Sequence, residues 1–278
     1  MHLDPSVLSE WTKLILRWVH VFASILWVGT TYFFTWLDGR FVELEQQGEG
    51  AKPPGRPEKE VWMVHSGGFY RVEKQKVPNV MPEKLHWFRW EAAITWLSGV
   101  LLLIMVYFHG GLMINFEDSP IGLGTAIWLS VGLLVAAWPV YDLLWFKLVK
   151  NETVGVFISL VLVVGMSWVL ARLLSGRAAY MQLGGMFGTI MVANVWMRIL
   201  PAQRRMVAAL KAGNEPDQAE AARAKTSSKH NTFIVIPVVF IMISNHFPTI
   251  TYGQRYNWVI LSALVLGGWW AAKVIRRA

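Results

Sequence analysis

The chain has 278 residues, of which 54% are hydrophobic and only 16% are charged, and it contains 16 Trp and no Cys. So few charges beside so much apolar area are hard to reconcile with a protein surrounded by water. The absence of Cys excludes a disulfide scaffold, a Cys-ligated metal site, a thiol nucleophile and a covalently attached c-type haem. The net charge of +8 indicates a type of partner only when the positions of the Lys and Arg residues along the chain are taken into account.

Seven apolar stretches are long enough to cross a bilayer, which takes about 20 residues of helix. We expect these spans at 14–37, 90–108, 123–145, 154–174, 180–200, 233–247 and 256–274. The sequence therefore predicts an all-α integral membrane protein, with residues 1–278 forming one domain built as a bundle of about seven transmembrane helices.

The segments between these spans differ strongly in basic charge. Those on one side carry 21 Lys and Arg residues, and those on the other side carry 5. Because Lys and Arg are retained in the cytoplasm, we expect the N-terminus outside and the C-terminus inside a bacterial cytoplasmic membrane. Basic loops beside anionic lipid also account for the net charge, so no nucleic-acid partner is expected.

Three cytoplasmic segments have distinct compositions. Residues 43–59 are rich in Gly, Pro and Gln and are typical of a flexible linker, whereas residues 203–228 predict a surface helix interrupted at 213–216. Residues 61–89 form a third segment, in which apolar and polar residues alternate on both sides of Ser66-Gly67-Gly68. This alternation predicts a β-hairpin at 61–76.

Three histidines from different spans are candidate cofactor ligands. With the predicted orientation, His20, His109 and His246 all lie in the outer leaflet, where ionisable side chains are costly and usually functional. Paired imidazoles from facing helices can hold a b-type haem. We expect His20 and His246 to ligate the haem iron, with His109 as a substitute, and Arg17 to bind a propionate.

A second interpretation of these histidines needs no cofactor, because a buried His often completes a hydrogen-bond network between helices. Polar residues at helical spacing accompany them and are expected to face inward. These stripes are His20, Ser24, Trp27, Thr31, Thr35 and Asp38 on the first span, and Glu91, Thr95, Ser98, Leu102, Met105 and His109 on the second. No role is assigned to His2 or His230, which fall in predicted loops.

Several motifs resemble the bacterial membrane-bound urate hydroxylase (urate oxidase) family of the PuuD type. They are residues 61–74, residues 81–91, Arg17-Trp-Val-His20 and Ser244-Asn-His246-Phe-Pro248. The resemblance covers essentially the whole chain and implies oxidation of urate to 5-hydroxyisourate, with electrons passed to a cytochrome instead of oxygen. Members of that family carry a cytochrome c domain after the membrane domain, and this chain matches only the membrane part. The expected acceptor is therefore a separate c-type cytochrome on the periplasmic side, while no oligomeric state is predicted.

Urate is a planar anion, so its site needs aromatic faces, cations and a proton acceptor. The hairpin segment contains all three. The expected roles are stacking for Phe69 and Tyr70, binding of urate oxygens for Arg71 and Lys74, base chemistry for His65 or His86, and proton transfer for Glu91.

Other interpretations stay open at this point. The hairpin could be an assembly element whose basic residues bind lipid headgroups. The whole chain could be a non-enzymatic haem b subunit that only transfers electrons. It could also be a small-solute or proton carrier that uses the stripe from Glu91 to His109.

Overall fold

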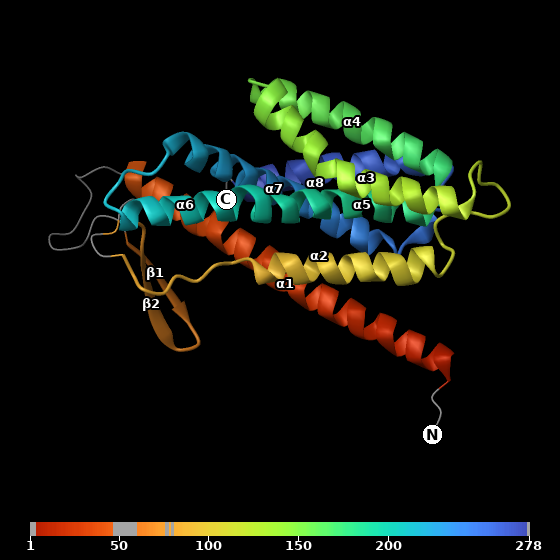
Figure 1. The fold of residues 1–278 in the computed structure, drawn as a ribbon, viewed down its shortest axis with the longest axis horizontal. Coiled ribbons are helices and arrows are strands. Elements are labelled where there is room, and N and C mark those ends of the chain that lie inside the picture. The colour runs from red at the N-terminus through yellow and green to blue at the C-terminus, as the bar shows by residue number, and fades with distance from the viewer. Residues whose placement is uncertain (1–3, 47–59, 76–77, 79–80, 277–278) are drawn as a thin grey trace.

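The computed structural model describes residues 4–46, 60–75, 78 and 81–276, which form a bundle of long helices with one small hairpin (Figure 1). The elements are α1 (Pro5–Gln46), β1 (Glu60–His65), β2 (Gly68–Glu73), α2 (Trp90–Leu102), η2 (Leu103–Phe108), α3 (Leu123–Leu143), η3 (Leu144–Leu148), α4 (Glu152–Leu173), α5 (Gly176–Ala193), η4 (Asn194–Ile199), α6 (Leu200–Lys211), α7 (Gln218–Ser244), η5 (Pro248–Ile250) and α8 (Asn257–Ile275). Segments η2, η3 and η4 are π-helical turns that directly continue the α-helices before them.

Within the described residues, seven helices are long and apolar enough to cross a membrane, which confirms the predicted helical bundle. Their outer surfaces are apolar as well. On α1, Trp18, Phe22 and Ile25 are each between 57% and 68% exposed. An apolar surface of this extent is unusual in contact with water but is what lipid requires, so the fold is compatible with a multi-pass membrane protein.

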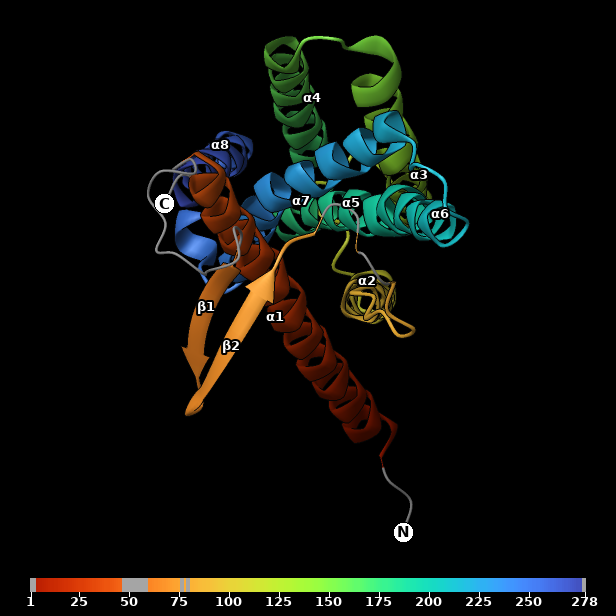
Figure 2. The same ribbon diagram turned by 90° about the vertical axis from the view of Figure 1, so that its left-hand side faces the viewer.

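Helix α5 lies at the centre of the bundle, where it contacts α2, α3, α4 and α7 (Figure 1). Helix α8 packs against α7 and α4. Helix α1 crosses α2 and also touches α7, and its N-terminal half extends beyond the other helices (Figure 2). This half of α1 is therefore held mainly by α2.

Two glycines allow helices to approach closely. A Cβ atom at Gly268 on α8 would lie 2.7 Å from the Pro237 nitrogen on α7, and a Cβ at Gly184 on α5 would lie 2.9 Å from the Met242 Cε atom, also on α7. Gly184 belongs to the small-residue pattern at which helix contacts form in membranes. These contacts fix α7 between α5 and α8.

The two strands pair antiparallel with Val61 opposite Val72 and His65 opposite Gly68. Ser66 and Gly67 form the two-residue turn with φ of 49° and 76°, which is the geometry of a tight hairpin turn. The predicted hairpin is therefore confirmed. Val61 packs with the buried Leu37 and Phe41 of α1, so the hairpin is docked on the C-terminal part of that helix. We call this end of the bundle the hairpin end and the other end the far end.

The helices extend further than the apolar residues alone indicated. Helix α1 begins at Pro5 and ends at Gln46, so residues 43–46 of the predicted linker are helical, while 47–59 lie outside the described residues. The predicted surface helix at 203–228 is not a separate element, because α6 continues α5 through η4 and α7 already begins at Gln218. Polar residues with high helix propensity prolong a helix as well as apolar ones do.

The predicted interruption at 213–216 does occur between α6 and α7. Gly213 has a φ of 74°, and the Asp217 carboxylate accepts hydrogen bonds from the backbone N–H groups of Ala219 and Glu220. A left-handed glycine ends a helix and a carboxylate N-cap begins one, so both boundaries have local causes.

Candidate functional site

His20 joins α1 to α2 through its imidazole ring. The Nδ1–H group donates to the Thr95 carbonyl oxygen at 2.9 Å, and Nδ1 also lies 3.2 Å from the Ser98 Oγ atom. The ring fits there because residue 99 is Gly: a Cβ atom at Gly99 would lie 3.0 Å from His20 Cε1. A backbone carbonyl that fixes one ring nitrogen leaves Nε2 as the atom able to ligate a metal.

The three candidate ligands do not share one depth, and this expectation is wrong for His20. His109 follows η2 and is 14 residues beyond Thr95, which corresponds to about 21 Å along the helix. His246 follows α7, whose end also lies at the far end, and both rings are exposed. The error arose because α1 begins at Pro5, nine residues before the predicted span, so counting from residue 14 placed His20 too near the outer surface.

No His, Cys, Asp or Glu side chains gather in threes as a possible metal site anywhere in the described part of the chain. Arg17 is exposed and lies near the far end, where it and Arg177 both act electrostatically on the buried Tyr107 hydroxyl. The Arg177 guanidinium lies 5.8 Å from the Tyr107 ring centroid, and its Nε–H group donates to Asn245 Oδ1 at 3.0 Å. The far end therefore holds two arginines from different helices that both act on the Tyr107 hydroxyl.

The predicted polar stripes are largely satisfied within their own helices. The hydroxyl groups of Ser24, Thr31 and Thr95 each donate to the carbonyl oxygen four residues earlier, at 2.6 to 2.8 Å. This is a common way for Ser and Thr to be accommodated in a helix. Of these stripes, the hydrogen bonds of His20 are the ones that cross from α1 to α2.

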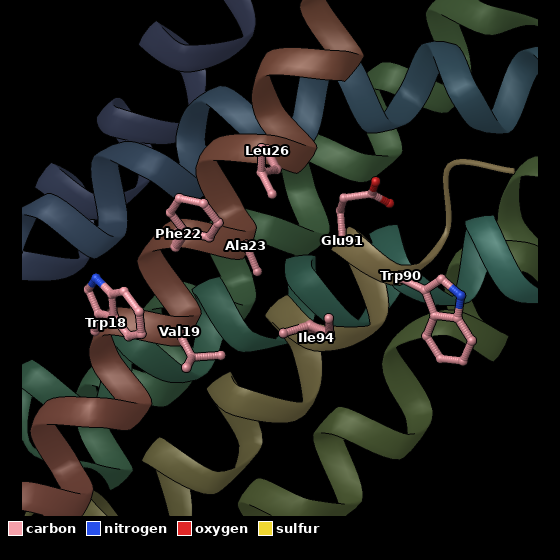
Figure 3. Close-up of a pocket in the computed structure, with 8 residues that line it drawn as sticks. All are labelled: Trp18, Val19, Phe22, Ala23, Leu26, Trp90, Glu91 and Ile94. Carbon is pink, nitrogen blue, oxygen red and sulfur yellow. The ribbon is translucent and has the colours of Figure 1, made fainter. Parts of the chain in front are cut away.

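Glu91 lies at a groove between α1 and α2 of about 360 Å³ (Figure 3). It is the one charged residue among those that line this groove, which are Trp18, Val19, Phe22, Ala23, Leu26, Trp90, Glu91 and Ile94. His20 is not among them. The groove is therefore apolar, with a single carboxylate at the start of α2.

The hairpin cations each have a carboxylate partner on the protein itself. Arg71 pairs with Glu60 at 3.0 Å, and Lys74 pairs with Asp38 of α1 at 2.5 Å. Phe69 and Tyr70 are 79% and 51% exposed near the turn. The hairpin thus presents aromatic rings to its surroundings, but binding of an anion by these cations would have to compete with two ion pairs.

The two histidines predicted as bases are both exposed. His65 ends β1, and His86 lies before α2 with its ring centroid 4.5 Å from that of Phe88. No hydrogen bond to either ring is found among the described residues. A proton acceptor is usually held in place by a hydrogen-bonding partner, so the geometry favours neither of them.

His230 has a hydrogen-bonding partner that holds its ring in place, unlike His65 and His86. Its Nδ1 atom is hydrogen bonded to the Tyr141 hydroxyl at 2.7 Å, and its ring centroid lies 4.2 Å from that of Trp145. The sequence alone gives it no role, because the predicted sixth span begins at residue 233, whereas α7 begins at Gln218. The spacing of Ser227 and Asn231, one helical turn apart, was the available signal of a polar helix face.

Other buried polar groups surround this pair. Asn194 and Ser227 are both fully buried beside the Tyr141 hydroxyl. Asn194 Nδ2 donates to Asn231 Oδ1 at 3.0 Å and its Oδ1 accepts from Trp138 Nε1 at 3.1 Å. Residues from α3, η4 and α7 therefore form one hydrogen-bonded group.

A neighbouring ion pair joins α3 to η4. Arg198 Nε and Nη2 donate to the two carboxylate oxygens of Asp142 at 2.7 and 2.6 Å. The Arg198 guanidinium also lies 4.7 Å from the Phe146 ring centroid. This bidentate geometry fixes η4 against the end of α3.

Comparisons with known proteins place the chain in a family. Searches among curated proteins and among solved structures gave no match. The family model described as urate oxidase N-terminal matches residues 6–277, which is nearly the whole sequence. The chain therefore belongs to the urate oxidase N-terminal family.

Proposed function

We propose that this protein oxidises urate to 5-hydroxyisourate within a bacterial cytoplasmic membrane. The observation that carries the proposal is the family match over residues 6–277, which supports an oxidoreductase acting on urate. In this reaction urate and one water give 5-hydroxyisourate, two protons and two electrons. The C5–O bond forms from the water oxygen, and the electrons pass to a one-electron acceptor.

The membrane setting is supported by the seven apolar helices and by the 21 to 5 distribution of Lys and Arg. With that distribution, the hairpin end faces the cytoplasm and the far end faces the periplasm. Urate would be oxidised from the cytoplasmic side. A c-type cytochrome on the periplasmic side would accept the electrons.

A b-type haem is the relay that we propose between the two sides, and His20 fits as one axial ligand. Its Nδ1–H group is fixed by Thr95, and the missing side chain at Gly99 leaves room for the ring. When bound, haem iron supplies reversible one-electron transfer. His246 and Arg17 lie at the far end, away from the level of His20, so the predicted pairing of His20 with His246 on one iron is withdrawn and no second ligand is assigned.

The hairpin remains our proposed recognition element for urate. Phe69 and Tyr70 supply exposed aromatic faces, and the ion pairs of Arg71 and Lys74 would open for the anion. His65 and His86 are the proposed bases there. Glu91, at the start of α2, is the proposed proton carrier.

The test uses the full chain purified in lipid nanodiscs. We expect a b-type band in the reduced-minus-oxidised spectrum and urate-dependent reduction of added cytochrome c, with two equivalents reduced per urate. Xanthine, which lacks the C8 oxygen, is the control substrate. A b-type band without urate turnover would reject the proposed urate oxidation in favour of an electron-transfer subunit. Absence of both the band and the turnover would favour a carrier.

A further inference from the structure

A layer of polar residues, several of them buried, crosses the bundle near its hairpin end. Its centre is Thr232 on α7: the Tyr32 hydroxyl of α1 donates to the Thr232 carbonyl oxygen at 3.0 Å, and Arg276 Nη1 at the end of α8 donates to its Oγ1 at 2.7 Å. Asn231 and His230 come directly before it and reach η4 and α3. Five helical segments therefore meet at one level through polar contacts.

These groups are deeply placed for polar side chains. Tyr141 is 8% exposed, Asn231 is 5% exposed and Asn194 is fully buried. Ionisable side chains inside a membrane bundle are costly and mark ion or proton pathways, and polar side chains there hydrogen bond between helices. Here residues of several helices share the cost of burying polar groups away from water.

The two π-helical turns next to the layer are a second, independent indication. Segment η3 begins three residues after Tyr141, and η4 begins at Asn194 itself. Such turns insert a residue into an α-helix and occur frequently at functional sites. Both helices that face His230 are thus locally rearranged at this level.

His230 connects the buried layer with the surface of the hairpin end. Its ring is only partly buried, and the charged groups that act on it are Lys229 and Glu152, which form an ion pair at 2.6 Å. Asp142 and Arg198 act on its partner Tyr141. The imidazole therefore contacts the Tyr141 hydroxyl through Nδ1 and also interacts electrostatically with the exposed Glu152 carboxylate.

The layer also lies close to the hairpin. Tyr32 reaches the layer from α1, and Leu37 and Phe41 on the same helix carry the hairpin. A separation of five to nine residues corresponds to about 8 to 14 Å along the helix. The residues that carry the hairpin therefore lie about one and a half to two and a half helical turns from Tyr32 in the polar layer.

We propose that Tyr141 and His230 form a proton relay that removes the protons released by urate oxidation. The proposal rests on the proposed function. As a proton arrives at the Tyr141 oxygen, the hydroxyl proton moves to His230 Nδ1, and the proton on Nε2 leaves toward Glu152. The imidazole returns to its Nε2–H form after each transfer, so the two protons of each urate pass one after the other, while its two electrons go to two equivalents of the one-electron acceptor.

The experiment measures urate-dependent reduction of cytochrome c in nanodiscs for His230→Ala, His230→Gln and Tyr141→Phe. Proton transfer by a placed side chain is worth about 10² to 10⁴-fold, so we expect at least a hundredfold loss in both His230 variants. Added imidazole should raise the activity of His230→Ala to at least a tenth of the wild-type rate, because it can occupy the space of the lost ring. His230→Gln keeps a hydrogen-bonding group of similar size and should not respond.

Two further readouts separate proton transfer from a merely structural role. Tyr141→Phe should show a larger solvent deuterium isotope effect than the wild type at an unchanged unfolding temperature. Thr226→Ala, one turn earlier on α7, is the matched control and should keep the wild-type rate. The relay is overturned if His230→Gln oxidises urate at the wild-type rate, or if imidazole fails to restore activity to a folded His230→Ala protein. Wild-type protein without urate turnover would instead overturn the proposed function, and the relay with it.

Discussion

The imidazole of His20 and the carbonyl oxygen of Thr95 are 2.9 Å apart, and this hydrogen bond connects two helices that are 75 residues apart in the sequence. It sets the ring orientation and leaves Nε2 without a hydrogen bond among the described residues. It also determines the level of His20 in the bundle, closer to the start of α2 than to its end.

His20→Gln tests the cofactor assignment directly. If His20 holds the haem, the variant should lose the b-type band in the reduced-minus-oxidised spectrum, because an amide cannot replace imidazole as an axial ligand. Ser24→Ala is the control, since the Ser24 hydroxyl donates to the His20 carbonyl oxygen of its own helix at 2.6 Å and to nothing else in the described part of the chain. An intact band in His20→Gln would reject this ligand.

Gly99→Ala probes the space around the same ring. The added Cβ would lie 3.0 Å from His20 Cε1 and should push the imidazole aside, whereas a Cβ at Gly29 would meet nothing within 4 Å. Disturbing the immediate surroundings of a metal ligand typically costs about 10 to 100-fold in affinity, so haem titration should show a loss of at least tenfold in Gly99→Ala. Gly29→Ala should bind as the wild type does, and equal affinities would contradict this account.

Gly268 and Gly267 form a matched pair on α8. A Cβ at Gly268 would lie 2.7 Å from the Pro237 nitrogen and 2.9 Å from its Cα atom, and a Cβ at Gly267 would meet nothing within 4 Å. Since neither contact is with a flexible side chain, Gly268→Ala should reduce the free energy of unfolding by about 1 to 3 kcal/mol. Thermal unfolding in detergent measures this difference. Equal unfolding temperatures for Gly268→Ala and Gly267→Ala would show that α7 and α8 pack less closely at Gly268 than these distances indicate.

Phe41→Ala should detach the hairpin without unfolding the bundle. Phe41 is 4% exposed and packs with Leu37 and Val61, whereas the neighbouring Val42 is 48% exposed. Removing a buried aromatic side chain typically costs about 3 to 5 kcal/mol. Here this loss should weaken the packing of residues 60–73 against α1. Hydrogen exchange of those residues should accelerate in Phe41→Ala and stay unchanged in Val42→Ala. Faster exchange throughout the helices would instead mean that the hairpin stabilises the whole bundle.

Asp142→Asn should be more harmful than the loss of the whole ion pair. The variant leaves the Arg198 guanidinium partly buried without its carboxylate, and an unpaired buried charge costs about 3 to 5 kcal/mol. The double variant Asp142→Asn with Arg198→Gln removes both charges and should recover part of that loss. Thermal unfolding of the two single variants and the double variant gives the coupling energy, and simple additivity would contradict a direct pair.

The secondary structure followed from local patterns. The helices could be predicted because bilayer thickness requires long apolar runs, and the hairpin because alternation around Ser66-Gly67 has one tight turn that satisfies it. Helix ends were less accurate: α1 begins nine residues before the predicted span, because its polar ends form helix as readily as its apolar centre.

The site depended on information that a linear sequence does not contain. Apolar runs and turn residues act over a few neighbours, so the sequence alone determined the helices and the hairpin. Which depth His20 occupies, which carboxylates pair with Arg71 and Lys74, and that His230 faces Tyr141 were decided by the tertiary structure. Helix tilt and rotation set these contacts, and both result from packing among all the helices together.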